Sequence, residues 1–358
     1  MRLPARDRRY RYILVEAAKP LSTPVPAVNL GSTITRLGSQ SKLAIPESTF
    51  ELGIVQVKQG VFDIASCLIF AHGKVTPWSR YLVSEDTYRK TALVADCDLL
   101  HSENGVAIGF NRNWRNYYHW MLQCLPAVYS YMLHIRKQPI ILLPKNLDLL
   151  RCTSLALLGL EQKSIIYAAA QQINIKALYT SSYLLGDAVF TPSRLTREVF
   201  DQIKRRCLPD SITHRGGRII YISRQDSPNR PITNEKQLID TLERSGVECV
   251  VTSEMTLHDQ VALFDSASIV IGGHGAGLTN IGFCRPGAVL YELHPSHYIN
   301  KCFEMIAISC GVEYWADVFP AEPEELKGRH RTNWTVDIGV VLDRLSEIKG
   351  SREPESVN

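Results

Sequence analysis

The sequence predicts an α/β protein whose C-terminal half is a doubly wound domain. Strand-like apolar runs alternate with helical patterns, first over residues 138–168 and again over 218–295. Such alternation is typical of parallel βαβ units. In the second run an apolar strand enters a glycine-rich turn near residue 273, as strands do at the carboxyl edge of an open sheet. The chain has 358 residues, which is enough for two domains.

The first half is expected to begin irregularly, with short β-like runs up to residue 110. A helix is predicted over 116–135, and Pro126 is expected to bend or break it because proline lacks the donor that a helix interior needs. The remaining elements of this half are predicted as strand, helix and strand, at 138–144, 147–160 and 163–168.

The second half is predicted to alternate strands with helices. Strands are expected at 218–224, 247–252, 268–273 and 288–295. Helices are expected at 234–246, 256–267 and 336–348, with a loop running into a further helix at 274–284. A linker is expected near 192–217. These elements divide the chain into an N-terminal α/β domain, a C-terminal Rossmann-like domain and a tail with an amphipathic helix, at 1–205, 206–322 and 323–358.

The composition is that of a globular protein, with 45% hydrophobic and 21% charged residues. A net charge of +4, without a basic stripe between aromatic residues, argues against nucleic-acid binding. The nine cysteines are scattered singly without a CxxC pair. This favours buried thiols in a reducing compartment over a disulfide scaffold or a zinc site.

The N-terminal segment and the hydropathy pattern predict where the protein works. Residues 1–20 carry positive charge but lack the apolar run of a secretory signal. No run approaches the roughly 18–20 apolar residues that a membrane span needs. We therefore expect a cytoplasmic protein. The basic side chains of this segment either contact an anionic membrane face or form a solvated tail; they are Arg2, Arg6, Arg8, Arg9 and Arg11.

The most informative segment surrounds His274, whose neighbours carry little or no side chain: Gly272, Gly273, Gly275, Ala276 and Gly277. A backbone with so few side chains predicts that a large group lies close to it. Backbone N–H groups and a helix N-terminus at this edge of a parallel sheet suit a phosphate-bearing ligand. The segment is neither a Walker A loop nor an early GxGxxG fingerprint. Tight strand–helix turns also use glycine for purely structural reasons.

Three further side chains follow predicted strands of this half. Arg224 ends one strand and Arg230 lies six residues further on. The rigid fork of an arginine matches two phosphate oxygens, so these residues suit a diphosphate; the alternative is a surface arginine. Glu292 ends another strand, where a carboxylate is suited to accept hydrogen bonds from a ribose diol.

Two other stretches contain candidate chemistry. His119 lies near the start of the helix predicted over 116–135, with Gln123 one turn further on the same face. It is interpreted as a functional histidine, although histidines among aromatic residues are often core groups. Asp96 and Asp98 have the spacing of a metal-binding Asp-x-Asp motif. Their short flanking run makes this metal site the weaker interpretation.

Three stretches, in this order and spacing, resemble glycosyltransferase family 61: NYYHWMLQCLPAV, YISRQDSPNRPITNE and IGGHGAGLTNIGFCRPGAVLYELHP. The resemblance covers about residues 110–300. It implies a GT-B fold, in which two Rossmann-like domains face a cleft. It also implies an inverting transfer from a nucleotide-sugar donor, with no cofactor and usually no essential metal.

The resemblance also implies roles for particular residues. His119 and His274 become the candidate catalytic residues, and Asn116 and Gln123 lie on the acceptor side. The donor-binding set is Arg224, Arg230, Gly273, Gly275, Ala276, Gly277, Leu278, Thr279, Asn280 and Glu292. There is one departure, because relatives often carry a carboxylate where this chain has Gln123. Either a histidine is the base, or the chain is weakened in catalysis.

The sequence therefore predicts an inverting glycosyltransferase of capsular or exopolysaccharide biosynthesis, acting on a glycan or lipid-linked acceptor. One alternative is a nucleotide-sugar-binding or scaffold protein without catalysis, which Gln123 motivates. A second alternative is a nicotinamide enzyme on the same kind of sheet, and the missing early GxGxxG counts against it.

Overall fold

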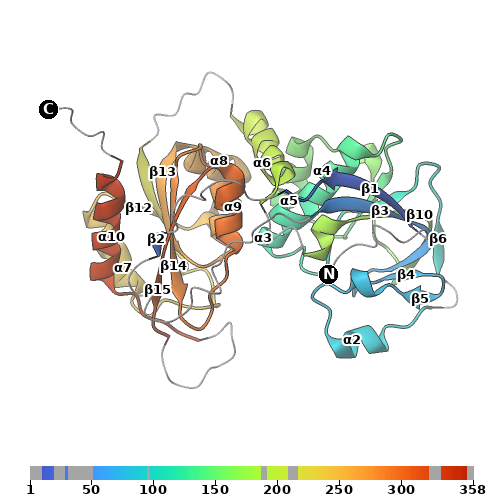
Figure 1. Cartoon of the computed structure of the whole chain (residues 1–358), viewed down its shortest axis with the longest axis horizontal. Coiled ribbons are helices and arrows are strands. Elements are labelled where there is room, and N and C mark those ends of the chain that lie inside the picture. Colours follow the sequence, from blue (N-terminus) through green and yellow to red (C-terminus); the bar gives the residue numbers. More distant parts are fainter. Residues whose placement is uncertain are drawn as a thin grey trace. The chain divides into compact units, whose positions relative to one another are not determined.

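The structure is a computed structural model, and it describes residues 10–19, 29–30, 51–94, 97–186, 192–208, 217–321 and 332–352. The chain divides into two compact units, each built on its own sheet (Figure 1). Unit 1 comprises Met1–Thr23, Ile45–Ile212 and Thr256–Val261, and unit 2 comprises Pro24–Ala44, Thr213–Met255 and Ala262–Asn358. Across the described residues, we find no helix with the length and hydropathy that a membrane span requires.

Unit 1 contains a mixed nine-stranded sheet, in the order β5-β4-β3-β10-β7-β8-β9, with β1 on β3 and β6 on β10. Its strands are β1 (Arg11–Glu16), β3 (Leu52–Asp63), β4 (Ile69–Ala71), β5 (Lys74–Val75), β6 (Asp98–Leu100), β7 (Val106–Ile108), β8 (Ile140–Leu143), β9 (Ile165–Tyr167) and β10 (Gln172–Ser181). The strands β10, β7, β8 and β9 are parallel, whereas β3 runs antiparallel to β10. The α/β class is confirmed, but this sheet is mixed rather than wholly parallel.

The helices of unit 1 pack around this sheet. They are α2 (Glu85–Lys90), α3 (Tyr117–His119), α4 (Leu125–His134), α5 (Leu149–Leu158) and α6 (Arg194–Cys207), with 3₁₀ turns η2 (Pro77–Ser79), η4 (Gln162–Ser164) and η5 (Ser182–Leu185). The prediction of a linker near 192–217 was wrong for its first part. Residues 194–207 form α6, which buries Leu195, Val199 and Ile203 at helical spacing.

The helix predicted over 116–135 is continuous but not regular. Between α3 and α4 lies a π-helical segment, η3 (Trp120–Cys124). Pro126 occupies the first turn of α4, directly after this segment, so its missing donor is accommodated there. Short π-helical segments are found frequently at functional sites. This one directly follows His119 and contains Gln123.

Unit 2 contains a parallel six-stranded sheet in the order β12-β11-β13-β14-β15-β2. Its strands are β2 (Asn29–Leu30), β11 (Arg218–Ile222), β12 (Glu248–Val250), β13 (Ala267–Gly273), β14 (Val289–Pro295) and β15 (Glu313–Phe319). Every pairing within it is parallel. The parallel sheet predicted for this half is therefore confirmed, with β15 and β2 as strands that were not predicted.

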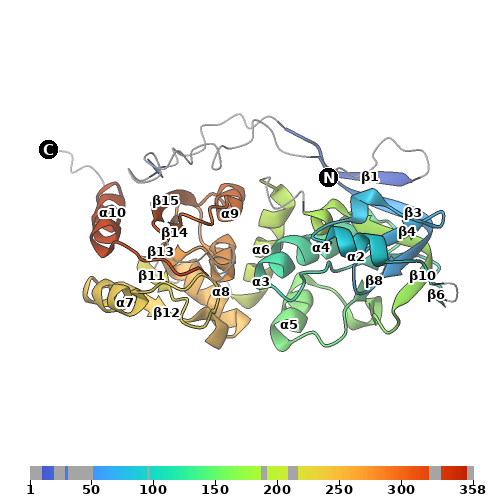
Figure 2. The same ribbon diagram turned by 90° about the horizontal axis from the view of Figure 1, so that it is seen from below.

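Helices cover both faces of this sheet (Figures 1 and 2). They are α7 (Glu235–Arg244), α8 (Leu257–Ser266), α9 (Cys302–Cys310) and α10 (Ile338–Gly350), with 3₁₀ segments η7 (Thr252–Glu254) and η8 (Ala276–Phe283). α7 and α10 lie on one face, and α9 lies on the other. α10 buries Val341, Leu345 and Ile348 against the sheet, which confirms the amphipathic helix. Fully burying each such side chain contributes about 1.5–3 kcal/mol.

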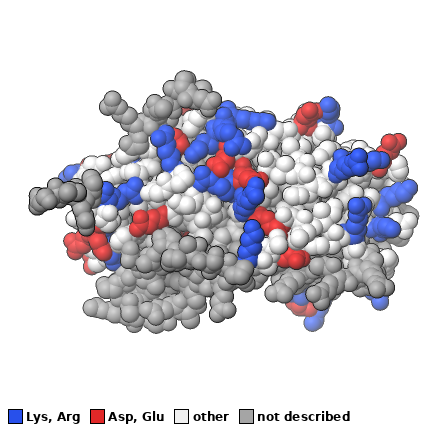
Figure 3. All heavy atoms as spheres, turned by 45° about the horizontal axis from the view of Figure 1, so that its top comes forward, with Lys and Arg blue, Asp and Glu red and all other residues white. Residues whose placement is uncertain are grey.

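Figure 3 shows one face of the molecule, on which charged side chains of both signs are present. On the face shown in Figure 3, lysine and arginine side chains alternate with acidic ones and do not form a continuous basic stripe. This distribution agrees with a net charge of +4. The N-terminal arginines proposed for membrane contact lie outside the described residues, except Arg11 in β1.

Candidate active site

The strand order of unit 2 has a reversal point between β11 and β13. From β11 the chain moves to β12 on one side and then returns to β13 on the other. In open α/β sheets, ligands bind outside the carboxyl ends of the strands at such a point. Arg224 lies two residues after the end of β11, and His274 directly follows β13. The two segments singled out in the sequence therefore meet where a ligand is expected.

The glycines of this turn make room for Arg224. A Cβ atom on Gly275 would lie 1.7 Å from Nη1 of Arg224, and one on Gly273 would lie 2.8 Å from Cδ of Arg224. The space beside Gly277 is taken by Ile222 and Thr252. The bare backbone was expected to admit a large ligand. In the structure the space beside Gly273 and Gly275 is occupied by the side chain of Arg224, which lies against the turn.

Arg224 is buried and held from several sides. The carboxylate of Glu235 accepts its backbone N–H at 2.6 Å, and Nη2 donates to the carbonyl of Asn229 and the hydroxyl of Ser227. Within the described part of the chain, its Nε has no hydrogen-bond partner. Burial, followed by the charge of Arg230, lowers the pKa of Arg224 to about 10. A buried cation whose side chain meets neutral acceptors is suited to bind an anion.

Arg230 lies on the same side of the loop. Its guanidinium stacks on the ring of Tyr298 at 4.7 Å, and Nη2 donates to the carbonyl of His274 at 3.2 Å. Its backbone has a φ of 52°, and its carbonyl accepts the indole N–H of Trp334 at 2.8 Å. Burial lowers the pKa of Arg230. Both arginines predicted for a diphosphate thus adjoin the glycine turn.

The loop after His274 is partly open to solvent. Ala276 and Gly277 are half-buried, whereas Leu278, Thr279 and Asn280 are buried. The helix expected here is the 3₁₀ helix η8, whose first hydrogen bond runs from the Leu278 N–H to the Gly275 carbonyl. The amides that precede this bond have no partner within the helix. The accessible part of the loop is therefore Ala276–Gly277.

His274 belongs to a buried polar cluster. Its Nδ1 lies 2.5 Å from Oε1 of Glu292, and the other carboxylate oxygen accepts the hydroxyl of Tyr314 at 2.8 Å. Nε2 of His294 lies 3.0 Å from the same hydroxyl. Burial lowers the pKa of His274 to about 4. Burial alone would raise the pKa of Glu292, but the adjacent imidazoles hold it low, at about 2. Glu292 thus holds a neutral His274 in place.

The ribose contact expected of Glu292 remains a prediction. Its side chain has 0% exposure, and both carboxylate oxygens are hydrogen-bonded inside the protein. Tyr314, which supplies one of these bonds, lies on β15, and no sequence pattern near it pointed to the site.

Three residues of the cluster have the ligand atoms that a metal would need: His274, Glu292 and His294. Two ligands of one tetrahedral zinc ion lie about 3.3 Å apart, given bonds of about 2.0 Å. The 2.5 Å separation of Nδ1 and Oε1 is instead that of a hydrogen bond. The Tyr314 hydroxyl also occupies the second carboxylate oxygen. The cluster fits a hydrogen-bonded network better than a metal site.

Glu304 is a buried carboxyl group beside this cluster. It lies in the first turn of α9 with 0% exposure, and neither oxygen has a hydrogen-bond partner among the described residues. Burial and then the negative charge of Glu292 raise the pKa of Glu304 to about 8. The group is therefore protonated at neutral pH. No sequence pattern around Glu304 pointed to this role.

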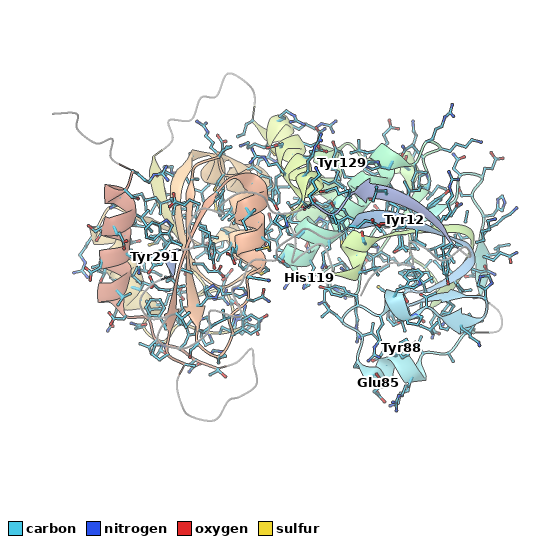
Figure 4. All side chains as sticks on the ribbon, in the orientation of Figure 1. Tyr12, Glu85, Tyr88, His119, Tyr129 and Tyr291 are labelled. Carbon is cyan, nitrogen blue, oxygen red and sulfur yellow. The ribbon has the colours of Figure 1, made fainter. Side chains whose placement is uncertain are left out.

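His119 lies in unit 1, at the end of α3 (Figure 4). Its Nδ1 is 2.8 Å from Oε1 of Gln123, which also accepts the side-chain N–H of Asn111 at 2.6 Å. The Nε2 of Gln123 donates to the hydroxyl of Tyr81 at 3.0 Å. Burial lowers the pKa of His119, and the bond to Gln123 opposes this effect. Asn111 and Tyr81 were not predicted from the sequence.

These contacts fix the proton on His119. The Oδ1 atom of Asn111 accepts the N–H of Asn113, so its Nδ2 faces Gln123. Because Nδ2 can only donate, the Gln123 atom that it meets is the acceptor Oε1. His119 must then donate through Nδ1, which leaves a lone pair on Nε2. Gln123 thereby determines the tautomer of His119.

The remaining sequence candidates have structural surroundings. Asn116 caps the helix at Tyr117 by accepting the N–H of Tyr118 at 2.9 Å. Asp98 is exposed at the start of β6, whereas Asp96 lies outside the described residues. Thr279 and Asn280 are buried within η8, and the hydroxyl of Thr279 has no hydrogen-bond partner in the described ranges.

Comparison with known proteins places the two clusters in one family domain. Residues 117–291 match the family described as Glycosyltransferase 61. The match begins two residues before His119 and ends one residue before Glu292, and it includes Arg224 and His274. The chain therefore carries a glycosyltransferase family 61 domain, as the sequence motifs indicated.

Curated relatives are similar over a limited stretch. A beta-1,2-xylosyltransferase of Arabidopsis thaliana is 26% identical over 155 residues, 37% of this chain and 27% of the relative. A beta-1,2-xylosyltransferase of Oryza sativa subsp. japonica is 28% identical over 34% of this chain and 26% of its own length. An EGF domain-specific O-linked N-acetylglucosamine transferase of Drosophila melanogaster is 32% identical over 34% and 25%. The chain thus matches about a quarter of each relative.

Proposed function

We propose that this chain is an inverting glycosyltransferase that uses a nucleotide-sugar donor. The observation that carries the proposal is the buried guanidinium of Arg224 against the Gly273–Gly275 turn, at the reversal point of a parallel sheet. The family match and its relatives, which by name transfer xylose or N-acetylglucosamine, support a sugar-transfer reaction. The donor diphosphate would contact Arg224, Arg230 and the amides of Ala276 and Gly277.

In this mechanism the donor-binding residues stabilise the leaving group. Cleavage of the sugar–phosphate bond transfers negative charge to the departing diphosphate. Fixed cations and backbone N–H groups stabilise that charge without having to reorganise. His274, held neutral by burial and oriented by Glu292, keeps the loop in place through its backbone, where its N–H donates to the Leu293 carbonyl at 3.0 Å.

His119 is the base in this proposal. Its Nε2 carries the lone pair, because Gln123 holds the proton on Nδ1. It would accept the proton of the acceptor hydroxyl as oxygen attacks the anomeric carbon. Gln123 thus acts as a positioning residue, a role that a neutral amide can fulfil. The GT-B arrangement, with acceptor and donor domains facing one cleft, is part of this proposal.

The acceptor and the cellular location of the protein are also part of the proposal. Its acceptor is a glycan or lipid-linked sugar of capsular or exopolysaccharide synthesis, and the protein acts in the cytoplasm or at the inner membrane face. The neutral Gln123 favours a second candidate, a nucleotide-sugar-binding protein with weakened catalysis, because an amide cannot take up a proton as a base.

Donor binding and turnover test these functions separately. Titration with nucleoside diphosphates, with and without a chelator, should show binding that does not depend on metal. Incubation with nucleotide sugars and a glycan extract should then release nucleoside diphosphate. Binding without release would favour the non-catalytic candidate. Absence of nucleoside diphosphate binding would refute both, and binding that disappears with chelator would restore a metal site.

A further inference from the structure

A pocket in unit 1 lies among residues that follow its parallel strands. It has a volume of about 290 Å³. Arg112, Trp114 and Arg115 line it after the end of β7, Lys145 lines it after β8, and Ala168 directly follows β9. The carboxyl ends of parallel strands are the usual place for ligands in open α/β sheets. No role has been assigned to this pocket so far.

The pocket carries positive charge that its neighbours do not neutralise. Arg112, Arg115 and Lys145 are exposed. Among the described residues, no carboxylate forms an ion pair with any of the three. The nearest acidic residue along the chain, Asp148, instead pairs with Arg151. Three cations around one hollow therefore favour an anionic ligand.

One wall of the pocket is held rigidly. The guanidinium of Arg115 stacks on the ring of Trp114 at 4.7 Å, a contact that orients the cation. Arg151 fixes the backbone beneath it, because Nε donates to the carbonyl of Trp114 at 3.1 Å and Nη2 donates to that of Arg115. A pre-positioned cation loses less freedom when it binds a ligand.

The loop that lines this pocket leads into α3, which ends at His119. The N–H of Trp114 donates to the carbonyl of Asn111 at 3.1 Å, and the side chain of Asn111 holds Gln123 beside His119. The pocket and the proposed base are thus built on one connected segment of unit 1.

We propose that this pocket binds an anionic group of the acceptor, a carboxylate or a phosphate on a sugar. The proposal rests on the function proposed above, in which His119 serves the acceptor. Arginine forks match the two oxygens of a carboxylate or phosphate, and the volume suits one charged sugar. The acceptor is therefore an acidic glycan or a sugar phosphate, and a neutral glycan does not fill the site.

Binding of simple charged sugars tests the proposal without a donor. Methyl glucuronide supplies the carboxylate, glucose 1-phosphate the phosphate, and methyl glucoside is the neutral comparison. We expect the full chain to bind at least one charged sugar and not the neutral one, and the sugar that binds identifies the anion. Arg115→Gln and Lys145→Gln should each weaken the binding of that charged sugar roughly five- to ten-fold. Arg115→Lys, which keeps the charge, should lose less.

Lys176→Gln is the matched control, since Lys176 is an exposed cation elsewhere in unit 1. It should bind as the parent does, and equal thermal melting of all variants shows that they fold. The proposal is wrong if neither charged sugar binds, if methyl glucoside binds equally well, or if the Arg115 and Lys145 variants keep parental affinity. If the proposal fails in this way while the parent still binds nucleoside diphosphate, only the pocket proposal is wrong. If the parent does not bind nucleoside diphosphate, the proposed function is wrong.

Discussion

The Nδ1 atom of His119 lies 2.8 Å from Oε1 of Gln123, which belongs to the π-helical segment directly after His119. Oε1 also accepts a hydrogen bond from Asn111, so it must face the imidazole as an acceptor. His119 therefore keeps its proton on Nδ1 and has its basic lone pair on Nε2. A carboxylate at position 123 would fix the same tautomer but would also raise the basicity of the imidazole.

Replacing His119 tests the base directly. His119→Ala should lower turnover by roughly 100-fold or more, because a positioned general base contributes about that factor. Affinity for the nucleotide-sugar donor should stay parental, since donor contacts are assigned to unit 2. His134→Ala, an exposed histidine at the end of the same helix, should change neither. Parental turnover in His119→Ala, or a loss explained by donor affinity alone, would contradict the assignment.

Gln123→Glu tests how the imidazole is positioned. The carboxylate would keep both accepted hydrogen bonds and could take a further one from the Tyr81 hydroxyl. Its charge should raise the pKa of His119, which burial lowers in the parent. A base works only above its pKa, so the acidic limb of the kcat/KM profile should move to higher pH.

The matched control for this change is Gln162→Glu, which adds the same charge at an exposed position and should leave the profile in place. An unmoved profile in Gln123→Glu would show that His119 does not titrate in the reaction. A substantial gain in activity on the high-pH plateau would show that a carboxylate is the better base. The parent would then be a weakened enzyme, and the histidine assignment would be wrong.

The parallel half of the fold was predictable because its signals are local. β11, β13 and β14 are rich in apolar residues, and α10 repeats its apolar positions at helical spacing. β3 was not predictable, because it is defined by antiparallel pairing with β10, in which Asp63 faces Gln172 more than 100 residues away along the chain. The amphipathic pattern of α6 was present, but its polar composition led to its interpretation as a linker.

The candidate site was predictable in its residue types but not in its contacts. The position of Arg224 after β11 and of His274 after β13 followed from the strand pattern. The sequence did not predict that the glycines leave space for the side chain of Arg224, because this contact joins segments that meet only in the folded domain. Glu292 was expected to face a ligand, yet its partners are His274 and Tyr314. Tyr314 comes from β15, whose place beside β14 is a property of the folded sheet.

Arg224 and Gly275 should act as a unit in donor binding. Arg224→Ala should weaken nucleoside diphosphate binding by about 1.5–3 kcal/mol, the range for a hydrogen bond to a charged group. Gly275→Ala should have a similar effect, because its Cβ would lie 1.7 Å from Nη1 of Arg224 and would displace the guanidinium. Backbone strain is not the cause, since the φ of Gly275 is −175°.

Isothermal titration of both single variants and the double variant measures this coupling. The double variant should lose little more than either single one, since both changes remove the same contact. Gly350→Ala, where a Cβ would meet nothing within 4 Å, is the control and should bind as the parent does. Additive losses in the double variant would show that the two residues act independently, and parental binding by Arg224→Ala would make it a structural arginine.

Glu304 should make the stability of the protein depend on pH. Its pKa is raised from the ordinary value of 4.5 to about 8 in the folded chain, so the folded state binds one more proton than the unfolded state between these values. The free energy of unfolding should therefore fall as pH rises from about 4.5 to 8.

Glu304→Gln keeps the shape of the protonated carboxyl and removes this dependence. Denaturant titrations at pH 5 and pH 8 should show little difference from the parent at pH 5 and a gain of several kcal/mol at pH 8, because each pKa unit between the folded and unfolded states corresponds to about 1.4 kcal/mol. Glu243→Gln, at an exposed position of α7, should show no such gain. An equal effect of Glu304→Gln at both pH values would mean that Glu304 does not hold a proton in the folded protein.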